Sequence, residues 1–350
     1  RDEFDRKSID KIGEEITGES PAITGVSVSE PAEGHLILLS GPTEAACDQI
    51  TRQVFDYLQK NPGINFPDAA YSLNQRQAFK YKRMAVCADL NDAIHLLSFL
   101  DSSLPPDSRR VRSFYEQAED RPIIFMFPGQ GAQYVGMGLD LYRTELRFRE
   151  EMDRCFEILD PFMKFDLKEI LYPEIPVDSV INQTEIAQPL LFIFEYALAK
   201  LLVRWGIKPQ SMIGHSIGEY TAACLSGFFS LEDALRLVVL RSKYMQEMPA
   251  GSMLSVSLSE EVLTPLLNED ISLAAVNSSS LCTVSGAIEK IETFAAHLDR
   301  LGYEYKPLHT SHAFHSGMMD PVLENFEKEV RKITMHKPGI PYISNVTGKF

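Results

Sequence analysis

The chain has 350 residues, enough for two or three domains, and its 45% hydrophobic and 24% charged residues are ordinary for a soluble globular protein. No apolar run approaches the roughly 18 residues that a membrane-spanning helix needs, and the charged N-terminal segment 1–7 lacks the apolar core of a signal peptide. The net charge of −15 argues against duplex nucleic acid as a partner, because such binding depends on Lys and Arg.

The cysteines indicate a reducing compartment, which we take to be the cytoplasm. They are odd in number, far apart, and include no Cys-x-x-Cys pair. Neither a disulfide framework nor a zinc site is therefore predicted. The five positions are Cys47, Cys87, Cys155, Cys224 and Cys282.

Two regions precede the part of the chain that carries the chemical motifs. Residues 1–34 combine mixed charge with Ser, Pro and Gly, which is typical of a linker or of the remnant of an upstream domain. Residues 35–121 predict a small α/β module without a glycine-rich phosphate loop or a nucleophile motif, so we interpret it as a scaffold. Its predicted elements are a strand over His35–Leu39, a helix capped by Thr43 and ending near Lys60, a helix from Asp68, a strand over Lys82–Ala88 and a helix over Asn91–Leu100, before a break at Pro105-Pro106-Asp107.

The third region, residues 122–350, predicts a parallel sheet. A buried strand over Ile123–Phe127 ends in a glycine-rich turn at 128–133, and a short strand over Gln210–Gly214 is followed by a helix over Ser216–Leu225. This recurring order of strand, tight turn and helix favours a parallel α/β sheet.

A second fold is predicted inside this region, at about 252–309. The order strand, helix, strand, strand, helix, strand is typical of ferredoxin-like domains. The six predicted elements are Met253–Leu258, Glu260–Leu267, Ile271–Val276, Leu281–Ser285, Ile288–Leu301 and Glu304–Leu308. We therefore expect an α/β protein in which a ferredoxin-like small subdomain is inserted into a larger parallel-sheet subdomain.

A motif for nucleophilic catalysis lies where the second predicted strand meets its helix. Gly214-His215-Ser216-Ile217-Gly218 fits the pattern Gly-x-Ser-x-Gly, whose glycines permit a sharp turn that lifts the serine hydroxyl to the open edge of the sheet. The amide of Ile217 then lies at a helix N-terminus, where it can stabilise a developing oxyanion. Ser216 is the predicted nucleophile, and the adjacent His215 is expected to point elsewhere and support the turn.

A serine nucleophile needs a general base, and the candidates form one cluster. Of the eight histidines, three follow the inserted subdomain in quick succession, namely His309, His312 and His315. Such a cluster can also bind a metal. Because it lacks nearby carboxylate and cysteine ligands, catalysis is favoured over zinc binding.

Arg241 follows Ser216 by 25 residues and lies in the apolar helical segment 237–243. An arginine among apolar residues must reach a counter-charge or water. Two interpretations stay open. The side chain extends to solvent, or its guanidinium binds a substrate carboxylate in bidentate fashion.

Three ordered motifs resemble those of a known family. Phe127–Gln133, Gly214–Glu219 and the sequence His-Ala-Phe-His at 312–315 resemble segments of the acyltransferase domains of modular type I polyketide synthases, which are related to malonyl-CoA:acyl-carrier-protein transacylase. The resemblance covers about 122–350, and residues 35–121 resemble the linker module between the ketosynthase and the acyltransferase. Both ends of the chain look like cuts, so we expect a piece of a larger synthase whose acyltransferase domain continues past Phe350.

The resemblance implies a hydrolase-like large subdomain and catalytic roles for matched positions. Ser216 would be the nucleophile and His315 the base, while Gln130 would join the amide of Ile217 in the oxyanion hole. No Asp partner is expected for His315. The family orients this histidine through a backbone carbonyl, which we expect beyond Phe350.

The resemblance also implies a set of substrate-binding residues. Arg241 would pair with the free carboxylate of a dicarboxylic acyl group. The other substrate-binding positions would be Gln188, His215, His312 and Phe314.

The preferred acyl group follows from the same motifs. Malonyl-selecting members resemble His-Ala-Phe-His, whereas methylmalonyl-selecting ones carry Tyr-Ala-Ser-His and usually have Gln at the position of Ile217. Phe314 would occupy the space that a substituent methyl needs, so malonyl-CoA is the expected substrate. A single pocket change of this kind discriminates by roughly 1–3 kcal/mol.

The implied reaction moves a malonyl unit from malonyl-CoA to the phosphopantetheine thiol of an acyl carrier protein, with no bound cofactor or metal. The implied partners are that carrier protein and the ketosynthase domain of the same polypeptide. Two alternatives stay open, a serine hydrolase in which water attacks the acyl-enzyme and a scaffold module without activity. Hydrolases of the α/β type need an acid between Ser and His. The inserted subdomain, Gln130 and Arg241 favour the transferase.

Overall fold

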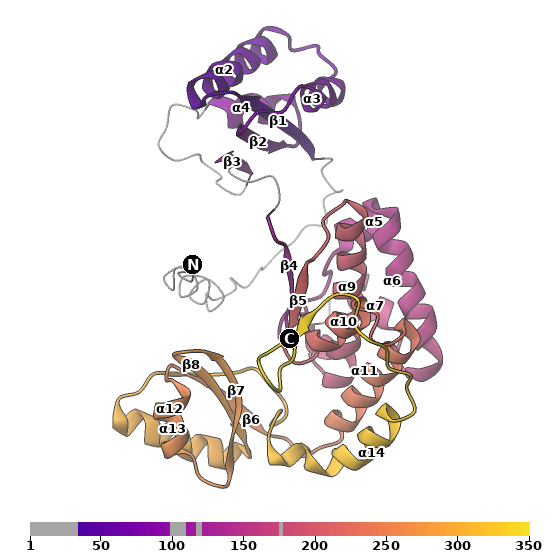
Figure 1. Ribbon diagram of the computed structural model, residues 1–350, viewed down its shortest axis with the longest axis vertical. Helices are drawn as coiled ribbons and strands as arrows, with labels where there is room; N and C mark the ends of the chain where they lie inside the picture. Colours follow the sequence, from indigo (N-terminus) through magenta and orange to yellow (C-terminus); the bar gives the residue numbers. More distant parts are fainter. Residues whose placement is uncertain (1–33, 99–109, 117–120, 175–177) are drawn as a thin grey trace. The chain divides into compact units, whose positions relative to one another are not determined.

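The computed structural model describes residues 34–98, 110–116, 121–174 and 178–350. The interpretation of residues 1–33 as a linker and the predicted break at 105–107 therefore lie outside the described residues. The chain divides into two compact units, Arg1–Asp120 and Arg121–Phe350 (Figure 1).

A three-stranded antiparallel sheet in the order β1-β2-β3 forms the N-terminal unit, and three helices pack against it. Its elements are β1 (His35–Gly41), α2 (Glu44–Lys60), α3 (Phe66–Asn74), β2 (Tyr81–Cys87), α4 (Leu90–Ser98) and β3 (Val111–Tyr115). Ile37, Leu39 and Ala85 are buried with the helix residues Leu58 and Leu97 in one apolar core. This core is separate from that of the C-terminal unit.

The helix boundaries in this unit follow from side-chain caps. The predicted cap at Thr43 is confirmed, because its hydroxyl accepts a hydrogen bond from a backbone amide in the first turn of α2 at 3.2 Å. The next helix begins at Phe66 and not at the predicted Asp68, since Asn65 caps it. Strand β3 was not predicted. Only Val111 of this strand is buried, so the sequence there has no alternating apolar pattern.

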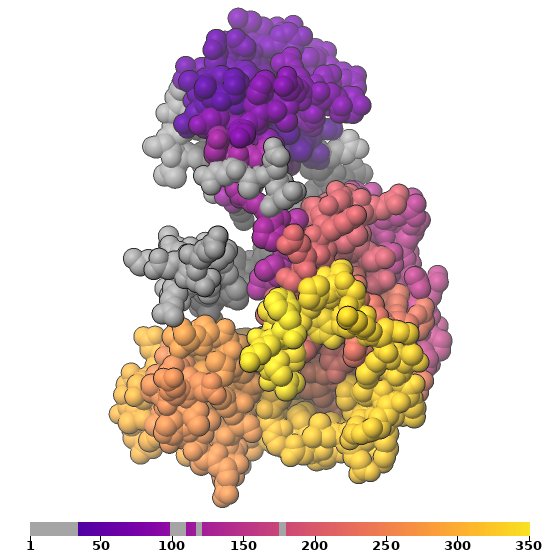
Figure 2. Space-filling view, viewed as in Figure 1, coloured from indigo at the N-terminus to yellow at the C-terminus, as the bar shows by residue number. Residues whose placement is uncertain are grey.

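In the C-terminal unit, a large subdomain is built around three parallel strands in the order β10-β5-β4. The strands are β4 (Ile124–Phe127), β5 (Ser211–Gly214) and β10 (Tyr342–Ile343). The helices are α5 (Leu139–Thr144), α6 (Leu146–Leu159), α7 (Leu167–Leu171), α8 (Asp178–Ile181), α9 (Thr184–Arg204), α10 (Gly218–Leu225), α11 (Leu231–Gln246) and α14 (Asp320–Val330), with 3-10 turns η2 (Asp160–Phe162) and η4 (Gly317–Met319). Figure 2 shows the C-terminal residues, in yellow, at the surface of this subdomain. Parallel strands end at a common edge, so the segments that follow β4, β5 and β10 lie close together.

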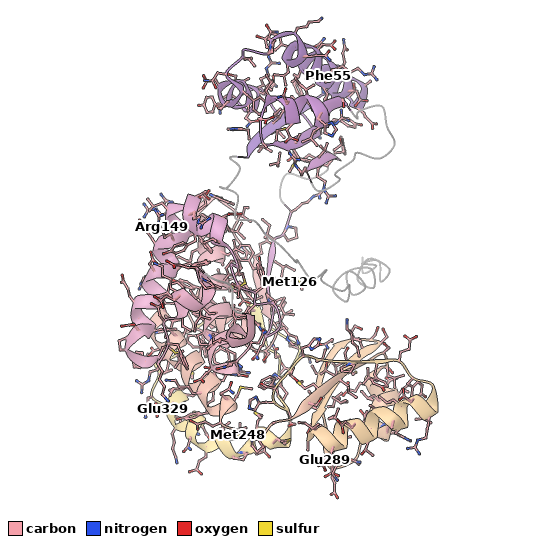
Figure 3. The ribbon with its side chains drawn as sticks, turned by 180° about the vertical axis from the view of Figure 1, so that it is seen from behind. Phe55, Met126, Arg149, Met248, Glu289 and Glu329 are labelled. Atoms are coloured by element: carbon pink, nitrogen blue, oxygen red, sulfur yellow. The ribbon has the colours of Figure 1, made fainter. Side chains whose placement is uncertain are left out.

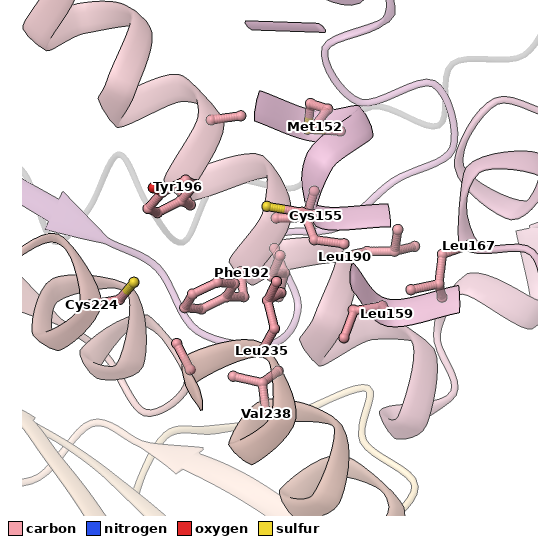
Figure 4. Packing of buried hydrophobic residues seen from close by; sticks show 14 of the residues in the cluster. Met152, Cys155, Leu159, Leu167, Leu190, Phe192, Tyr196, Cys224, Leu235 and Val238 are labelled. Atoms are coloured by element: carbon pink, nitrogen blue, oxygen red, sulfur yellow. The ribbon is translucent and has the colours of Figure 1, made fainter. Parts of the chain in front are cut away.

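Helix α9 is the centre of the large subdomain. Helices α6, α10 and α11 pack against it, and Figure 4 shows its Leu190, Phe192 and Tyr196 among side chains of the neighbouring helices. By length and by its mean hydropathy of 1.6 the helix could cross a membrane, but 72% of its apolar window is buried inside the protein. Glu195 and Lys200 also interrupt the apolar run. The pattern is that of a core helix.

The ferredoxin-like subdomain lies between α11 and α14 in the sequence, as Figure 1 shows. Its four strands form an antiparallel sheet in the order β7-β8-β6-β9. The elements are β6 (Ser252–Val256), α12 (Glu260–Leu263), η3 (Thr264–Leu266), β7 (Ile271–Ser278), β8 (Leu281–Gly286), α13 (Ile288–Leu301) and β9 (Tyr305–Pro307). The predicted fold class is confirmed. The predicted helix over Glu260–Leu267 is too long, because Pro265 lies in the 3-10 turn that replaces its second half.

Candidate active site

The turn between β5 and α10 holds Ser216 in a left-handed backbone conformation, with φ of 51°. Side chains would not fit at the two flanking glycines. A Cβ at Gly214 would lie 2.1 Å from the backbone carbon of Gly218, and a Cβ at Gly218 would lie 2.4 Å from the carbonyl oxygen of Phe127. The helix therefore starts at Gly218 and not at the predicted Ser216, because a residue with positive φ cannot belong to a right-handed helix.

Ser216 meets His315 at the edge of the sheet. The Ser216 Oγ and His315 Nε2 atoms are 2.9 Å apart, although the two residues are 99 positions apart in the sequence. His315 lies in the loop between β9 and η4 and has φ of 58°. Among the described residues, Ser216 and His315 are the only ones other than glycine with positive φ. Such strained conformations cluster at functional sites.

The surroundings of His315 keep its imidazole neutral. Removal from bulk water, and to a smaller extent the nearby charges of Arg241 and His215, together lower the pKa of His315 to about 4. A neutral imidazole at neutral pH can accept a proton from the serine hydroxyl. Among the described residues no carboxylate contacts His315, so an acid partner is absent there.

Arg241 directs its guanidinium into the site and not out to solvent. Its Nη2 donates to Ser216 Oγ at 3.2 Å and its Nη1 to Gln188 Oε1 at 2.5 Å. The guanidinium carbon lies 5.6 Å from the centre of the Tyr220 ring. No described carboxylate neutralises this charge, which leaves it available to an anionic ligand.

Gln130 and Gln188 continue the polar network away from Arg241. The Nε2 of Gln188 donates to Gln130 Oε1 at 3.2 Å, and the Nε2 of Gln130 donates to Thr184 Oγ1 at 3.4 Å. Gln188 is only 2% exposed, so this network is shielded from water. Thr184, which no sequence motif indicated as a site residue, is the first residue of α9, four positions before Gln188.

Ile217 lies next to Ser216 with its side chain in the core. This side chain is 1% exposed and packs with the apolar residues of the large subdomain, and its expected part in selecting malonyl stays a prediction. Its amide N–H has no hydrogen-bond acceptor among the described residues. That amide lies beside Ser216 and directly before α10, as the oxyanion assignment requires.

The remaining predicted substrate-binding residues, Phe314, His312 and His215, lie in different places relative to Ser216. Phe314 lines the cleft next to Ser216. His312 is 5% exposed, its Nδ1 contacts Ser311 Oγ at 2.7 Å and it does not line the cleft. His215 is exposed, and its Nε2 lies 3.3 Å from Oδ1 of Asn277 in the ferredoxin-like subdomain. The sequence prediction that His312 contacts substrate is thus not matched by its position.

A cleft of about 210 Å³ between the two subdomains is lined by six of the candidate residues, namely Gln130, Gln188, His215, Ser216, Phe314 and His315. Met245 of α11, Met253 of β6 and Phe314 form its apolar part. Met248 lies at the end of the large subdomain that faces the ferredoxin-like subdomain (Figure 3). A larger hollow of about 470 Å³ lies over α6 and α7, but none of the candidate site residues lines it.

No group of three His, Cys, Asp or Glu side chains that could hold a metal ion occurs within the described parts of the chain. All five cysteines are free and buried.

One residue that the sequence analysis missed contacts the backbone around Ser216. Asn345 follows β10, at the same sheet edge, and its side chain hydrogen-bonds to Ser216 N and Gly214 O. The signal that could have found it is its position after a strand of a parallel sheet, where site residues gather.

The family model described as the acyl transferase domain matches residues 124–349, which include the whole site. The chain belongs to this acyl transferase family. A second family model, that of the C-terminal part of CurL-like polyketide synthases, matches residues 35–97. The resemblance noted from the motifs is confirmed. The chain is an acyltransferase domain of the polyketide synthase type, preceded by its linker module.

Relatives of this acyltransferase domain include synthases and single enzymes. The mycoketide-CoA synthase of Mycobacterium tuberculosis is 35% identical over 316 residues, which cover 89% of this chain and 7% of that protein. The solved acyl transferase domain of ZmaA is 41% identical, with a TM-score of 0.82 over 93% of this chain and 74% of that one. The malonyl-CoA:ACP transacylase of Synechocystis is 30% identical, with a TM-score of 0.57 over 65% of this chain and 75% of that one. The chain spans about a fifth or less of the length of the curated relatives it matches.

Proposed function

We propose that this acyltransferase domain transfers a malonyl unit from malonyl-CoA, through an ester of Ser216, to the phosphopantetheine thiol of an acyl carrier protein. The observation that carries the proposal is the position of the Ser216 hydroxyl. It lies 2.9 Å from a neutral imidazole and 3.2 Å from an arginine without a carboxylate partner among the described residues. The first neighbour suits proton transfer, and the second suits an acyl group with a free carboxylate.

In the first half-reaction, Ser216 Oγ attacks the thioester carbonyl carbon while its proton passes to His315 Nε2. The carbonyl oxygen becomes an oxyanion, which the Ile217 amide and the Gln130 side chain would stabilise. In the structure the Gln130 Nε2 donates to Thr184, so this role requires its amide to turn towards the oxyanion. Collapse of the intermediate breaks the carbon–sulfur bond. The leaving thiolate takes the proton from His315, which gives free coenzyme A and malonyl-Ser216.

The second half-reaction repeats these steps with a different nucleophile. The phosphopantetheine thiol gives its proton to His315 Nε2, and the resulting thiolate attacks the ester carbonyl carbon. The carbon–oxygen bond then breaks and Ser216 Oγ recovers the proton. The same base therefore serves both halves, which its neutral resting state permits.

The proposed preference for malonyl rests on charge and on space. Arg241 is half-buried next to Ser216, so an acyl group with a carboxylate near its thioester carbonyl would replace the missing counter-charge. Phe314, Met245 and Met253 restrict the apolar part of the cleft. This supports an unsubstituted malonyl group over a branched one.

The proposed partners follow from the domain context. The match of residues 35–97 to part of polyketide synthases supports a ketosynthase as the neighbouring domain of the same polypeptide. An acyl carrier protein is the proposed acceptor, because the reaction needs a thiol. The five free, buried cysteines are compatible with a reducing compartment such as the cytoplasm.

The test is the mass of the intact protein after incubation with malonyl-CoA. We expect the wild-type protein to gain one malonyl group on Ser216 and Ser216→Ala to gain none. Addition of a phosphopantetheinylated carrier protein should then move the group to the carrier thiol. Rapid release of free malonate, with no transfer to the carrier, would support a hydrolase instead. Labelling at another residue would rule out Ser216 as the nucleophile.

A further inference from the structure

Asn345 forms hydrogen bonds to backbone groups on both sides of His215. Its Oδ1 accepts from the amide of Ser216 at 3.0 Å, and its Nδ2 donates to the carbonyl oxygen of Gly214 at 2.6 Å. Its own backbone amide donates to Glu219 Oε1 at 3.2 Å. One residue thus connects the end of β5, the nucleophile and the first turn of α10.

The sheet brings Asn345 to this position. Strand β10 pairs in parallel with β5, with Tyr342 opposite Met212 and Ile343 opposite Ile213. The segment after β10 therefore emerges beside the turn that carries Ser216. A hydrogen bond from Gly348 N to Ser344 O closes this segment into a compact turn, which holds Asn345 against the strand end.

The two contacts of the Asn345 side chain require an amide. The backbone N–H of Ser216 needs an acceptor and the carbonyl of Gly214 needs a donor, and the oxygen and nitrogen of the asparagine amide supply both from one planar group. A carboxylate of the same shape would keep the first bond and lose the second. It would also place a negative charge beside the Gly214 carbonyl and the Glu219 carboxylate, where burial already raises the pKa of Glu219.

The left-handed backbone conformation of Ser216 is unfavourable unless other groups stabilise it. A left-handed backbone at a residue other than glycine is unfavourable by roughly 1–2 kcal/mol, and Ser216 N–H has no partner in a strand or helix. The turn also has the bond from the His215 amide to the Phe127 carbonyl at 2.8 Å, and two bonds at the start of α10, from the Gly218 amide to the His215 carbonyl at 3.0 Å and from the Glu219 amide to the Ser216 carbonyl at 3.1 Å. These bonds hold the strand end and the carbonyl side of Ser216, whereas Asn345 supplies the acceptor for the Ser216 amide.

We propose that Asn345 is a positioning residue that holds the backbone of Ser216 in its left-handed conformation, so that Oγ stays within reach of His315. Glu219 assists by anchoring the Asn345 backbone. The inference rests on the proposed role of Ser216 as the nucleophile. Asn345 is itself exposed, so water can replace its bonds when it is removed. Its loss should therefore disturb alignment more than folding.

The test compares three variants with the wild-type protein. Asn345→Ala removes both side-chain bonds, and Asn345→Asp keeps only the acceptor. Thr347→Ala is the matched control in the same turn, where the Thr347 hydroxyl accepts a hydrogen bond from Lys349 N. The rate of acylation is measured in single-turnover reactions over a range of malonyl-CoA concentrations. For the first half-reaction this gives the limiting rate constant, here called kcat, and the half-saturating concentration, here called KM. An alkyl fluorophosphonate, which reacts with activated serines irrespective of the acyl group, gives a second rate. Thermal unfolding midpoints show whether each variant is folded.

We expect both Asn345 variants to lose about 10- to 100-fold in kcat, the range that misplacement of a reacting group causes, with KM changed less than about threefold. The fluorophosphonate rate should fall in parallel, and Thr347→Ala should match the wild type. Acylation by Asn345→Ala within threefold of the wild type, or a loss confined to KM, would overturn the proposal. Full activity of Asn345→Asp would overturn the role of the Gly214 bond. If Asn345→Ala does not fold, the isosteric Asp variant decides.

The two probes separate this inference from the proposed function. If the wild-type protein is not labelled by malonyl-CoA but Ser216 reacts with the fluorophosphonate in an Asn345-dependent manner, the malonyl assignment fails and the positioning role holds. If malonyl labels Ser216 equally well in all variants, the positioning role fails and the assignment holds.

Discussion

The guanidinium of Arg241 lies within hydrogen-bonding distance of the Ser216 hydroxyl, with 3.2 Å between Nη2 and Oγ. The position where an acyl carbonyl is attacked and the position where a carboxylate can bind are thus only a few bonds apart. Malonyl separates these two groups by a single carbon atom. For the proposed function, this arrangement suits short dicarboxylic acyl groups better than long ones. The same positive charge also helps to keep His315 deprotonated.

Replacement of His315 should be far more damaging than replacement of His312. His315→Ala removes the base next to Ser216 Oγ, so acylation by malonyl-CoA should slow by a factor on the order of 10² or more. His312→Ala should lower the thermal unfolding midpoint, because His312 is buried next to Ser311, and should leave acylation nearer to the wild-type rate. Greater loss of acylation rate in a folded His312→Ala protein would show that the base is misassigned.

Removal of Arg241 should change the ratio of substrates. Malonyl carries a free carboxylate and acetyl does not, so an acetyl group leaves the arginine charge without a partner, which costs several kcal/mol when the charge is buried. In Arg241→Ala we expect malonyl transfer to fall while acetyl transfer holds or rises. The measurement is kcat/KM for both thioesters on both proteins. If the malonyl-to-acetyl ratio of kcat/KM is the same in Arg241→Ala and in the wild type, Arg241 does not bind the substrate carboxylate and its role is structural.

The pH dependence of kcat/KM should reflect the lowered pKa of His315. A base with a pKa of about 4 stays competent as the pH falls through 6.5, the ordinary value for histidine, and loses activity only as the pH approaches its own pKa. The kcat/KM for malonyl-CoA should therefore be constant between about pH 5.5 and 8 and should fall only at more acidic pH. In Arg241→Ala, one of the charges that lower this pKa is gone, so the acid limb should move to higher pH. An acid limb near pH 6.5 in the wild-type protein would contradict the assignment.

Glu195 should make the protein less stable as the pH rises. It is 5% exposed in α9, its Oε2 accepts from Thr221 Oγ1 at 2.8 Å, and its Oε1 has no hydrogen-bond partner among the residues that the structure describes. Burial raises the pKa of Glu195 to about 8. Between its ordinary value and about 8 the folded protein keeps a proton that the unfolded chain has lost, so the free energy of unfolding falls with rising pH through this range.

Glu195→Gln tests this consequence, because glutamine keeps the acceptor for Thr221 and cannot ionise. The variant should have a higher thermal unfolding midpoint than the wild type, and the difference should grow from pH 5 to pH 8. The exposed Glu157→Gln on α6 is the control and should show no such trend. A difference that is constant with pH would mean that Glu195 stays ionised in the folded protein.

The sequence by itself determined the local features of this protein. The elbow at Ser216 was predictable because the requirement for Gly214 and Gly218 arises from backbone atoms only a few residues away and from the adjacent strand. The order of strands and helices in the ferredoxin-like subdomain was predictable from periodicity. Helix boundaries followed where a side chain caps its own first turn, as at Thr43.

The tertiary structure decided which side chains meet. Three histidines followed the subdomain in the sequence, and only the loop between β9 and η4 determines that His315 contacts Ser216 while His312 is buried elsewhere. The direction of Arg241, the core position of Ile217 and the contact of Asn345 with the elbow were equally open. Each depends on which face of an element packs against the core and on pairing between strands far apart in the chain. These long-range constraints leave no pattern in the local sequence.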